Sequence, residues 1–156
     1  MIKVLLVTTS NNAVRTVLAH EAGVELEVIE CTIPLEITKR ALADYVRSTT
    51  IDLIITYRCP IILHKDIYSR ARLGAFNIHP SLLPKNSGLN PWPEILRNDE
   101  REGGVTLHHL TTQVDGGPIV FQSSFVINET DTLEMMREKS DKHAAILMKK
   151  LLRVII

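Results

Sequence analysis

The sequence predicts an α/β domain with a Rossmann-like three-layer arrangement, in which helices flank a mostly parallel central sheet. Apolar, strand-like runs at residues 2–7, 26–29 and 53–55 alternate with helical patterns, and this order favours parallel pairing. The first run is nearly continuous in aliphatic residues, as is typical of a strand buried on both faces. A length of 156 residues without repeats or linker-like stretches indicates one domain, spanning residues 1–156.

Composition argues against several classes of protein. The 18 basic and 18 acidic residues balance and are interspersed, so we expect no nucleic-acid partner. The N-terminal apolar run is too short for a signal peptide, and no segment is long enough to span a membrane. Cys31 and Cys59 lack paired spacing, and we interpret them as reduced thiols. We therefore expect a soluble cytoplasmic protein without a membrane partner, acting as a monomer or a homodimer.

Two helices are expected in the first half of the chain. The first follows the N-terminal strand, with Ser10 or Asn11 as its N-cap and Gly23 as its stop. The second should begin near Pro34 and extend to about Arg47. The pattern then predicts a loop at 56–63, a short helical piece at 65–72 and a strand that ends at 79.

The second half begins with a short helix expected at 92–97, after which Gly103 and Gly104 should turn the chain. In the strand predicted at 105–110, His108 and His109 point to opposite faces. A zinc site that uses both histidines would need them to converge, so we expect no metal.

A polar loop at 111–117 precedes a strand expected at 119–126 and a long C-terminal helix. Asp131 should cap this helix, with Glu134 completing a capping box. The helical spacing predicts a buried stripe of Leu133, Met136, Ser140, Ala144, Leu147, Leu151 and Val154.

The stretch from Phe76 to Pro84 places polar side chains where an apolar strand ends. Asn77 and His79 project from the same face of the strand, while the residues between them project into the packing. Pro80 ends the hydrogen-bonded ladder, so His79 should lie at the rim of the sheet, where open α/β sheets bind ligands.

Together with Asp115, these two side chains suit acyl transfer without a protein nucleophile. The amide of Asn77 and an imidazolium at His79 can stabilise the negative charge that develops on a carbonyl oxygen under attack by an amine. A carboxylate near the imidazole favours its charged form and can move protons between the incoming and leaving amines. Serine hydrolase chemistry fits less well, because Ser81 has no nucleophile elbow around it.

Several separated motifs resemble those of 10-formyltetrahydrofolate-dependent formyltransferases, and among these enzymes the phosphoribosylglycinamide formyltransferases are the most similar. The motifs are Asn77-Ile78-His79-Pro80-Ser81-Leu82-Leu83-Pro84, then Gly88, Gly104-Val105-Thr106-Leu107-His108 and Val114-Asp115-Gly116-Gly117-Pro118-Ile119. The resemblance extends from about Asp52 into the C-terminal helix and implies the formyltransferase fold.

The resemblance also implies a set of site residues. Asn77, His79 and Asp115 fall on the catalytic trio of the family, and 10-formyltetrahydrofolate is the formyl donor. The residues expected to hold the pterin ring of this folate, largely through their backbone, are Pro60, Ile61, Ile62, Leu63, Thr111, Thr112, Gln113 and Val114, with His108 beside them. The Leu83–Pro84 bond is cis in relatives, and the sequence alone does not decide between cis and trans here.

The acceptor side departs from the family pattern. Glycinamide-ribotide enzymes hold the substrate phosphate on a glycine-rich turn after the first strand, whereas residues 8–12 here contain no glycine. Lys142 stands where those enzymes place an acidic residue before the histidine that corresponds to His143. The acceptor-binding residues are therefore expected to be Ser10, Asn11, Asn12 and Gly88.

The predicted function is transfer of the formyl group of 10-formyltetrahydrofolate to the amine of a small-molecule acceptor. Methionyl-tRNA formyltransferases add a C-terminal β-barrel and a basic surface that are not found in this sequence, so tRNA is not the expected acceptor. Two alternatives stay open: a folate-binding or regulatory module without turnover, and a hydrolase that releases formate.

Overall fold

A six-stranded sheet with strand order β2-β1-β3-β4-β5-β6 forms the centre of the computed structural model, which describes all 156 residues. The strands β1 to β4 run parallel, and β5 and β6 are antiparallel to their neighbours. The strands are β1 (Ile2–Thr8), β2 (Val24–Glu30), β3 (Ile51–Tyr57), β4 (Ala71–His79), β5 (Glu102–His109) and β6 (Ile119–Val126). The predicted mostly parallel sheet is confirmed.

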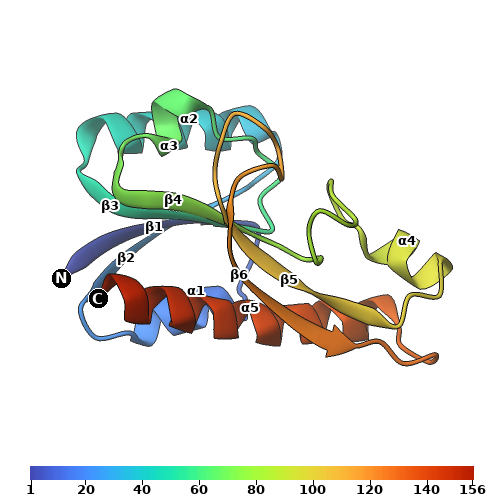
Figure 1. Ribbon diagram of the computed structural model, residues 1–156. Coiled ribbons are helices and arrows are strands. Elements are labelled where there is room, and N and C mark those ends of the chain that lie inside the picture. Colours follow the sequence, from blue (N-terminus) through green and yellow to red (C-terminus); the bar gives the residue numbers. More distant parts are fainter.

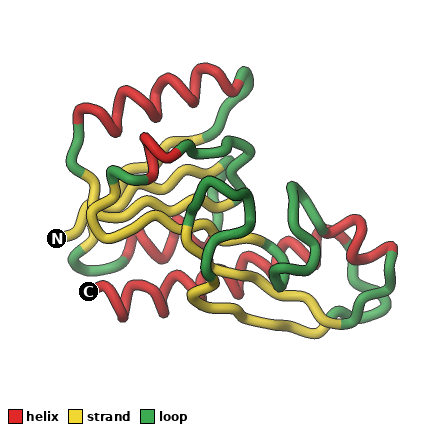
Figure 2. The backbone as a smooth tube through the Cα atoms, turned by 45° about the horizontal axis from the view of Figure 1, so that its top comes forward, coloured by secondary structure: helices red, strands yellow, loops and turns green.

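Helices cover both faces of this sheet, which gives the predicted three layers (Figures 1 and 2). In Figure 1, α2 and α3 lie above the strands, and α1 and α5 lie below them. The helix α4 sits at the end of the long β5–β6 pair, which extends beyond the parallel strands. The helices are α1 (Ala13–His20), α2 (Leu35–Ser48), α3 (Lys65–Tyr68), α4 (Trp92–Arg97) and α5 (Leu133–Ile155).

The position of β1 between two helical layers explains why its sequence is nearly continuous in aliphatic residues. Val4 and Leu6 pack with α1 and α5 in one hydrophobic cluster, whereas Leu5 and Val7 pack with α2 in a second cluster on the other face. All four side chains are fully buried. Because successive side chains in a strand point to opposite faces, a strand between two helical layers needs apolar residues at every position.

Both predicted helix caps are wrong. The N-cap of α1 is Asn12, whose Oδ1 accepts from the backbone N–H of Arg15, and neither Ser10 nor Asn11 takes this role. The N-cap of α5 is Thr132, whose side chain accepts from Met135 N–H. The predicted cap, Asp131, instead pairs with Lys139 and accepts from Asn128 N–H, so the capping box with Glu134 does not form.

Three further predictions need correction. Gly103 and Gly104 lie within β5 and do not turn the chain. A Cβ at Gly104 would lie 2.4 Å from the carbonyl oxygen of Ser123, so the glycine lets β6 approach closely. The stripe on α5 is buried at its five central positions, whereas Leu133 and Val154 at its ends are exposed. The short helix α3 also ends at residue 68, because β4 already begins at residue 71.

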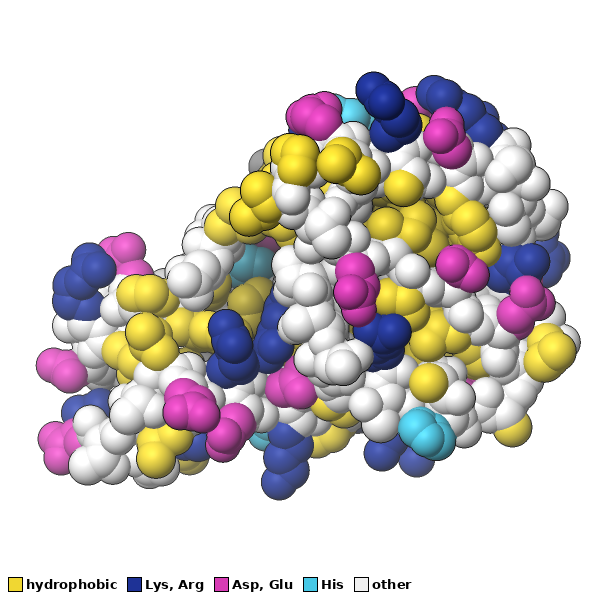
Figure 3. Space-filling model, turned by 180° about the vertical axis from the view of Figure 1, so that it is seen from behind, with side chains coloured by type: hydrophobic (Ala, Val, Ile, Leu, Met, Phe, Trp, Pro, Cys, Tyr) yellow, Lys and Arg dark blue, Asp and Glu magenta, His cyan; other side chains and the backbone are white.

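The surface mixes both signs of charge. Figure 3 shows acidic and basic side chains interspersed over one face, with apolar side chains between them. None of the helices has the length and apolarity that crossing a bilayer would require. The Leu83–Pro84 peptide bond is cis, as the resemblance implied, and the Ile33–Pro34 bond is cis as well.

Candidate active site

The strand β4 carries Asn77 and His79 to the edge of the sheet where the parallel strands end. It pairs with the parallel β3 on one side and with the antiparallel β5 on the other. Phe76 and Ile78 are buried in the core, as the alternation predicted. Two polar side chains therefore reach the same face at the point where the sheet changes from parallel to antiparallel pairing.

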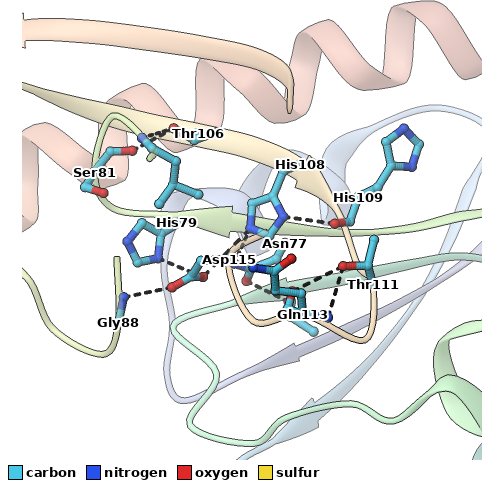
Figure 4. Close-up of polar contacts among 12 residues, drawn as sticks. Asn77, His79, Ser81, Gly88, Thr106, His108, His109, Thr111, Gln113 and Asp115 are labelled. Carbon is cyan, nitrogen blue, oxygen red and sulfur yellow. Dashed lines mark hydrogen bonds and ion pairs between the residues drawn. The ribbon is translucent and has the colours of Figure 1, made fainter. Parts of the chain in front are cut away.

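The imidazole of His79 lies between two oxygen acceptors, one of which is the Asp115 carboxylate drawn in Figure 4. Its Nδ1 is 3.4 Å from Asp115 Oδ1, and the two side chains are only 5% and 9% exposed. Its Nε2 is 2.9 Å from the carbonyl oxygen of Asn86, which can only accept. Because both ring nitrogens face acceptors, the arrangement suits an imidazolium that donates from each of them.

Asp115 is held by the backbone around it. Its φ of 54° places it in the left-handed region, at the end of a loop that returns toward β4. The N–H of Gly88 donates to Asp115 Oδ2 at 2.8 Å. A Cβ at Gly117 would lie 1.8 Å from the carbonyl oxygen of His109, so only glycine fits there. Gly88, which was expected to bind the acceptor, thus contacts the carboxylate of Asp115.

The amide of Asn77 is oriented by hydrogen bonds at both ends. The hydroxyl of Thr56 donates to Asn77 Oδ1 at 2.7 Å, and Asn77 Nδ2 lies 3.1 Å from His108 Nε2. His108 Nδ1 donates to the carbonyl oxygen of His109 at 2.9 Å, which leaves Nε2 as the acceptor for Asn77. Burial lowers the pKa of His108, in keeping with this neutral tautomer. One N–H of Asn77 remains for a ligand.

The structure thus places His108 behind Asn77, although the sequence suggested it for the donor loop. His109 points to the opposite face, as predicted: it is exposed, and its ring lies 4.7 Å from that of Phe76.

The two loops expected to hold the donor differ in what they expose. Ile61 and Leu63 are buried in the cluster beneath α2, so only their backbone can face a ligand. Leu110, which precedes the second loop, packs against the same cluster, so the two loops are neighbours. The side chains at the surface of these loops are Ile62, Thr112, Gln113 and Val114, while Pro60 and Thr111 are half-buried.

The turn expected to bind the acceptor is partly engaged within the chain. Ser10 and Asn11 are exposed, and Asn11 Oδ1 accepts from Arg15. Asn12 is buried, with its amide bonded to Thr8 and to the carbonyl oxygen of Ser10. This turn follows β1, and β3 lies between β1 and β4.

Sequence reasoning missed a cluster around Asp141 of α5. Asp141 Oδ2 accepts from the backbone N–H of Ala13 at 2.9 Å, and Oδ1 accepts from the Tyr57 hydroxyl at 3.0 Å. Arg58 Nη2 lies 3.6 Å from the same Oδ1. Arg58 lies in the loop predicted at 56–63, shortly after a predicted strand, which is a signal that could have drawn attention to it, whereas no local pattern marks Asp141.

Cys31 and Cys59 form a second contact that spacing did not predict. Their Sγ atoms lie 3.9 Å apart, and both thiols are free and half-buried. Cys31 follows β2 and Cys59 lies just beyond β3, so the pair lies at the same edge of the sheet as the site.

Comparison with known proteins identifies the family. The model of the Formyl transferase family matches residues 3–152. Methionyl-tRNA formyltransferase of Thermotoga maritima is 35% identical over 106 residues, which cover 68% of this chain and 34% of that protein. The bifunctional polymyxin resistance protein ArnA of Wigglesworthia glossinidia brevipalpis is 36% identical over 123 residues, 79% of this chain and 19% of that protein. The chain thus spans about a third or less of these two relatives.

Solved structures share the fold. Phosphoribosylglycinamide formyltransferase from Streptococcus pneumoniae aligns with a TM-score of 0.79 at 19% identity, covering 99% of both chains. A 4-N formyltransferase from Francisella tularensis aligns with a TM-score of 0.79 at 18% identity, covering 99% of this chain and 69% of that one. The expected formyltransferase fold is confirmed, and the match over nearly the whole sequence shows that this chain belongs to the formyl transferase family.

Proposed function

We propose that the chain transfers the formyl group of 10-formyltetrahydrofolate to the amine of a small-molecule acceptor. The observation that carries this proposal is the meeting of Asn77, His79 and Asp115 at the carboxyl edge of the sheet, in a chain of the formyl transferase family. The donor supplies a formyl carbon whose oxygen gains negative charge when an amine attacks.

Two N–H groups can stabilise that charge. The first is the N–H of Asn77 that His108 does not use. The second is His79 Nδ1–H, whose 3.4 Å separation from Asp115 Oδ1 is longer than a normal hydrogen bond, so this N–H can also donate to an oxyanion that lies beside the carboxylate. The Nε2–H of His79 stays on Asn86 and fixes the ring.

Asp115 is the proposed proton carrier. Its Oδ1 lies 3.4 Å from His79 Nδ1 and 4.0 Å from His108 Nε2, the atom that accepts from Asn77, so it borders the space beside both proposed N–H donors. As the acceptor nitrogen forms its bond to the formyl carbon, Asp115 takes a proton from that nitrogen, directly or through water. The same proton passes to the folate nitrogen as its bond to the formyl carbon breaks, so no net proton is gained or lost.

The donor is proposed to lie on the loops at 60–63 and 111–115. Support comes from the exposed apolar side chains of Ile62 and Val114 and from the backbone that flanks them in the two neighbouring loops. An aromatic pterin needs apolar contact on its faces and backbone groups at its polar edge, and the two loops offer both.

Turnover of 10-formyltetrahydrofolate, followed by absorbance with and without a panel of small amines, tests the proposal. We expect turnover that requires an amine and that falls on the order of a hundredfold in Asp115→Asn. Asp99→Asn is the matched control, because Asp99 is exposed in the loop before β5 and makes no contact with the site. Turnover without an amine would indicate a hydrolase, and binding without turnover would indicate a folate-binding module.

A further inference from the structure

The N-terminus of α1 is a natural anion site that the chain fills by itself. Helix N-termini present unpaired N–H groups and the positive end of the helix dipole, and in open α/β sheets they face the ligand edge. Here the N–H of Ala13, the first residue of α1, donates to Asp141 Oδ2 at 2.9 Å. The carboxylate comes from α5, far along the chain.

Further donors complete the arrangement, which we call the Asp141 cluster: Asp141 with Ala13, Tyr57 and Arg58. The hydroxyl of Tyr57 donates to Oδ1 at 3.0 Å, and the Arg58 guanidinium lies 3.6 Å from the same oxygen. Arg58 is 16% exposed and stacks 5.1 Å from the Tyr57 ring, while Asp141 is 25% exposed. The N-terminus of α1, which we call the α1 pole, offers an N–H group, and Tyr57 and Arg58 add a hydroxyl and a guanidinium. These are donors that would bind a phosphate, and the carboxylate of Asp141 already occupies them.

The Asp141 cluster lies at the same edge of the sheet as the proposed reaction centre, and the side chains of Arg58 and Asp141 are partly exposed to solvent. Tyr57 pairs with Ile78 in the neighbouring strand, so Arg58 follows at the level of His79. A hollow of about 510 Å³ is lined by both Ala13 and Asp141. Its other lining residues are Glu138, Lys142, Ala145, Ile146 and Lys149. An anion could therefore reach the pole from solvent if Asp141 did not hold it.

We propose that Asp141 is a specificity-determining residue that closes the α1 pole to phosphate. The acceptor is accordingly an amine that carries no phosphate on the side facing α1. A phosphate brought to the same donors would meet the carboxylate at contact distance, and such like-charge contact strongly disfavours binding. The conclusion about the acceptor rests on the proposed formyl transfer, whereas the closure of the pole does not.

Titration with inorganic phosphate tests the closure without any turnover. Asp141→Ala removes the resident anion and should bind phosphate roughly tenfold or more tightly than the unmodified protein, by calorimetry and by the rise of Tm with phosphate. Asp141→Asn removes the charge but keeps the shape of the side chain, and it should show the same gain. It replaces Asp141→Ala in the test if that variant does not fold. Glu138→Gln removes one negative charge from the same hollow without touching the pole, and it should bind phosphate as the unmodified protein does.

Equal phosphate affinity in the unmodified protein and in both Asp141 variants would overturn the inference. A second measurement tests the acceptor class. It compares kcat/KM for two amines that differ only in a phosphate, such as glucosamine and glucosamine 6-phosphate. The unmodified protein should prefer the unphosphorylated amine in kcat/KM, and Asp141→Ala should reduce that preference about tenfold. An unchanged preference would contradict the assignment of specificity to Asp141. If no amine is formylated while phosphate binding responds as expected, the proposed function fails and the closed pole stands.

Discussion

The contact between His79 and Asp115 gives the sharpest prediction. At 3.4 Å, opposite unit charges attract by about 5 kcal/mol in an effective dielectric of about 20. Both side chains are nearly buried, so loss of hydration offsets part of this attraction. If it offsets about half, about 2.5 kcal/mol remains, and where this interaction with the imidazolium is made in the transition state its loss corresponds to roughly 70-fold in rate.

His79→Ala and Asp115→Asn should therefore each lower kcat on the order of a hundredfold, and the double variant should be little slower than the slower single variant. Binding of the folate donor should change only about threefold in all three, because we propose that the donor is held largely by the backbone of the loops at 60–63 and 111–115 and not by these side chains. Single-turnover rates and donor titration by calorimetry measure the two effects. Losses in rate that add across the two sites, accompanied by equal losses in donor affinity, would mean that the residues only shape the pocket.

Two other predictions address the residues that orient Asn77. Thr56→Val removes the hydroxyl that donates to Asn77 Oδ1, so we expect roughly a tenfold loss of kcat with donor affinity retained, whereas Thr56→Ser should remain close to the unmodified rate. The second concerns pH. Burial lowers the pKa of His108 below its ordinary 6.5, so, as the pH falls, His108 takes up a proton at a higher pH in the unfolded chain than in the folded chain. Folding stability should be complete above about pH 6.5 and decline as the pH falls below it, and urea unfolding at several pH values should show a shallower decline in His108→Asn. Burial also lowers the pKa of His143, so part of the decline should persist, and an unchanged decline would exclude the contribution of His108.

The sheet and its layers could be predicted because they depend on pattern. The aliphatic run of β1 and the alternation of strands and helices can both be recognised in the sequence without knowledge of tertiary contacts. Helix caps carry a weaker signal, since Ser10, Asn11 and Asn12 are all good cap residues. The choice among them is made by the buried bond from Asn12 to Thr8, which the sequence alone does not show.

In the candidate site, too, local geometry places some residues, whereas others come together only through tertiary contacts. Asn77 and His79 lie two residues apart in one strand, so their common face follows from strand geometry. Asp115 could be placed beside them only through the resemblance, because no spacing rule joins it to β4. The Asp141 cluster had no comparable guide: Tyr57 and Asp141 meet across 84 positions of sequence. The backbone N–H of Gly88 also reaches Asp115, a contact that no pattern in the sequence indicated.

The chain order of these two groups bears on how such proteins diverge in evolution. Asn77, His79, Gly88, His108 and Asp115 come from one continuous stretch of sequence, whereas the Asp141 cluster draws on three segments that lie far apart. A substitution of Arg58 or Asp141 alters the charge at the N-terminus of α1 without changing the continuous stretch. Under the proposed role of Asp141, a lineage can change its acceptor through substitutions at these positions while the stretch from Asn77 to Asp115 stays the same.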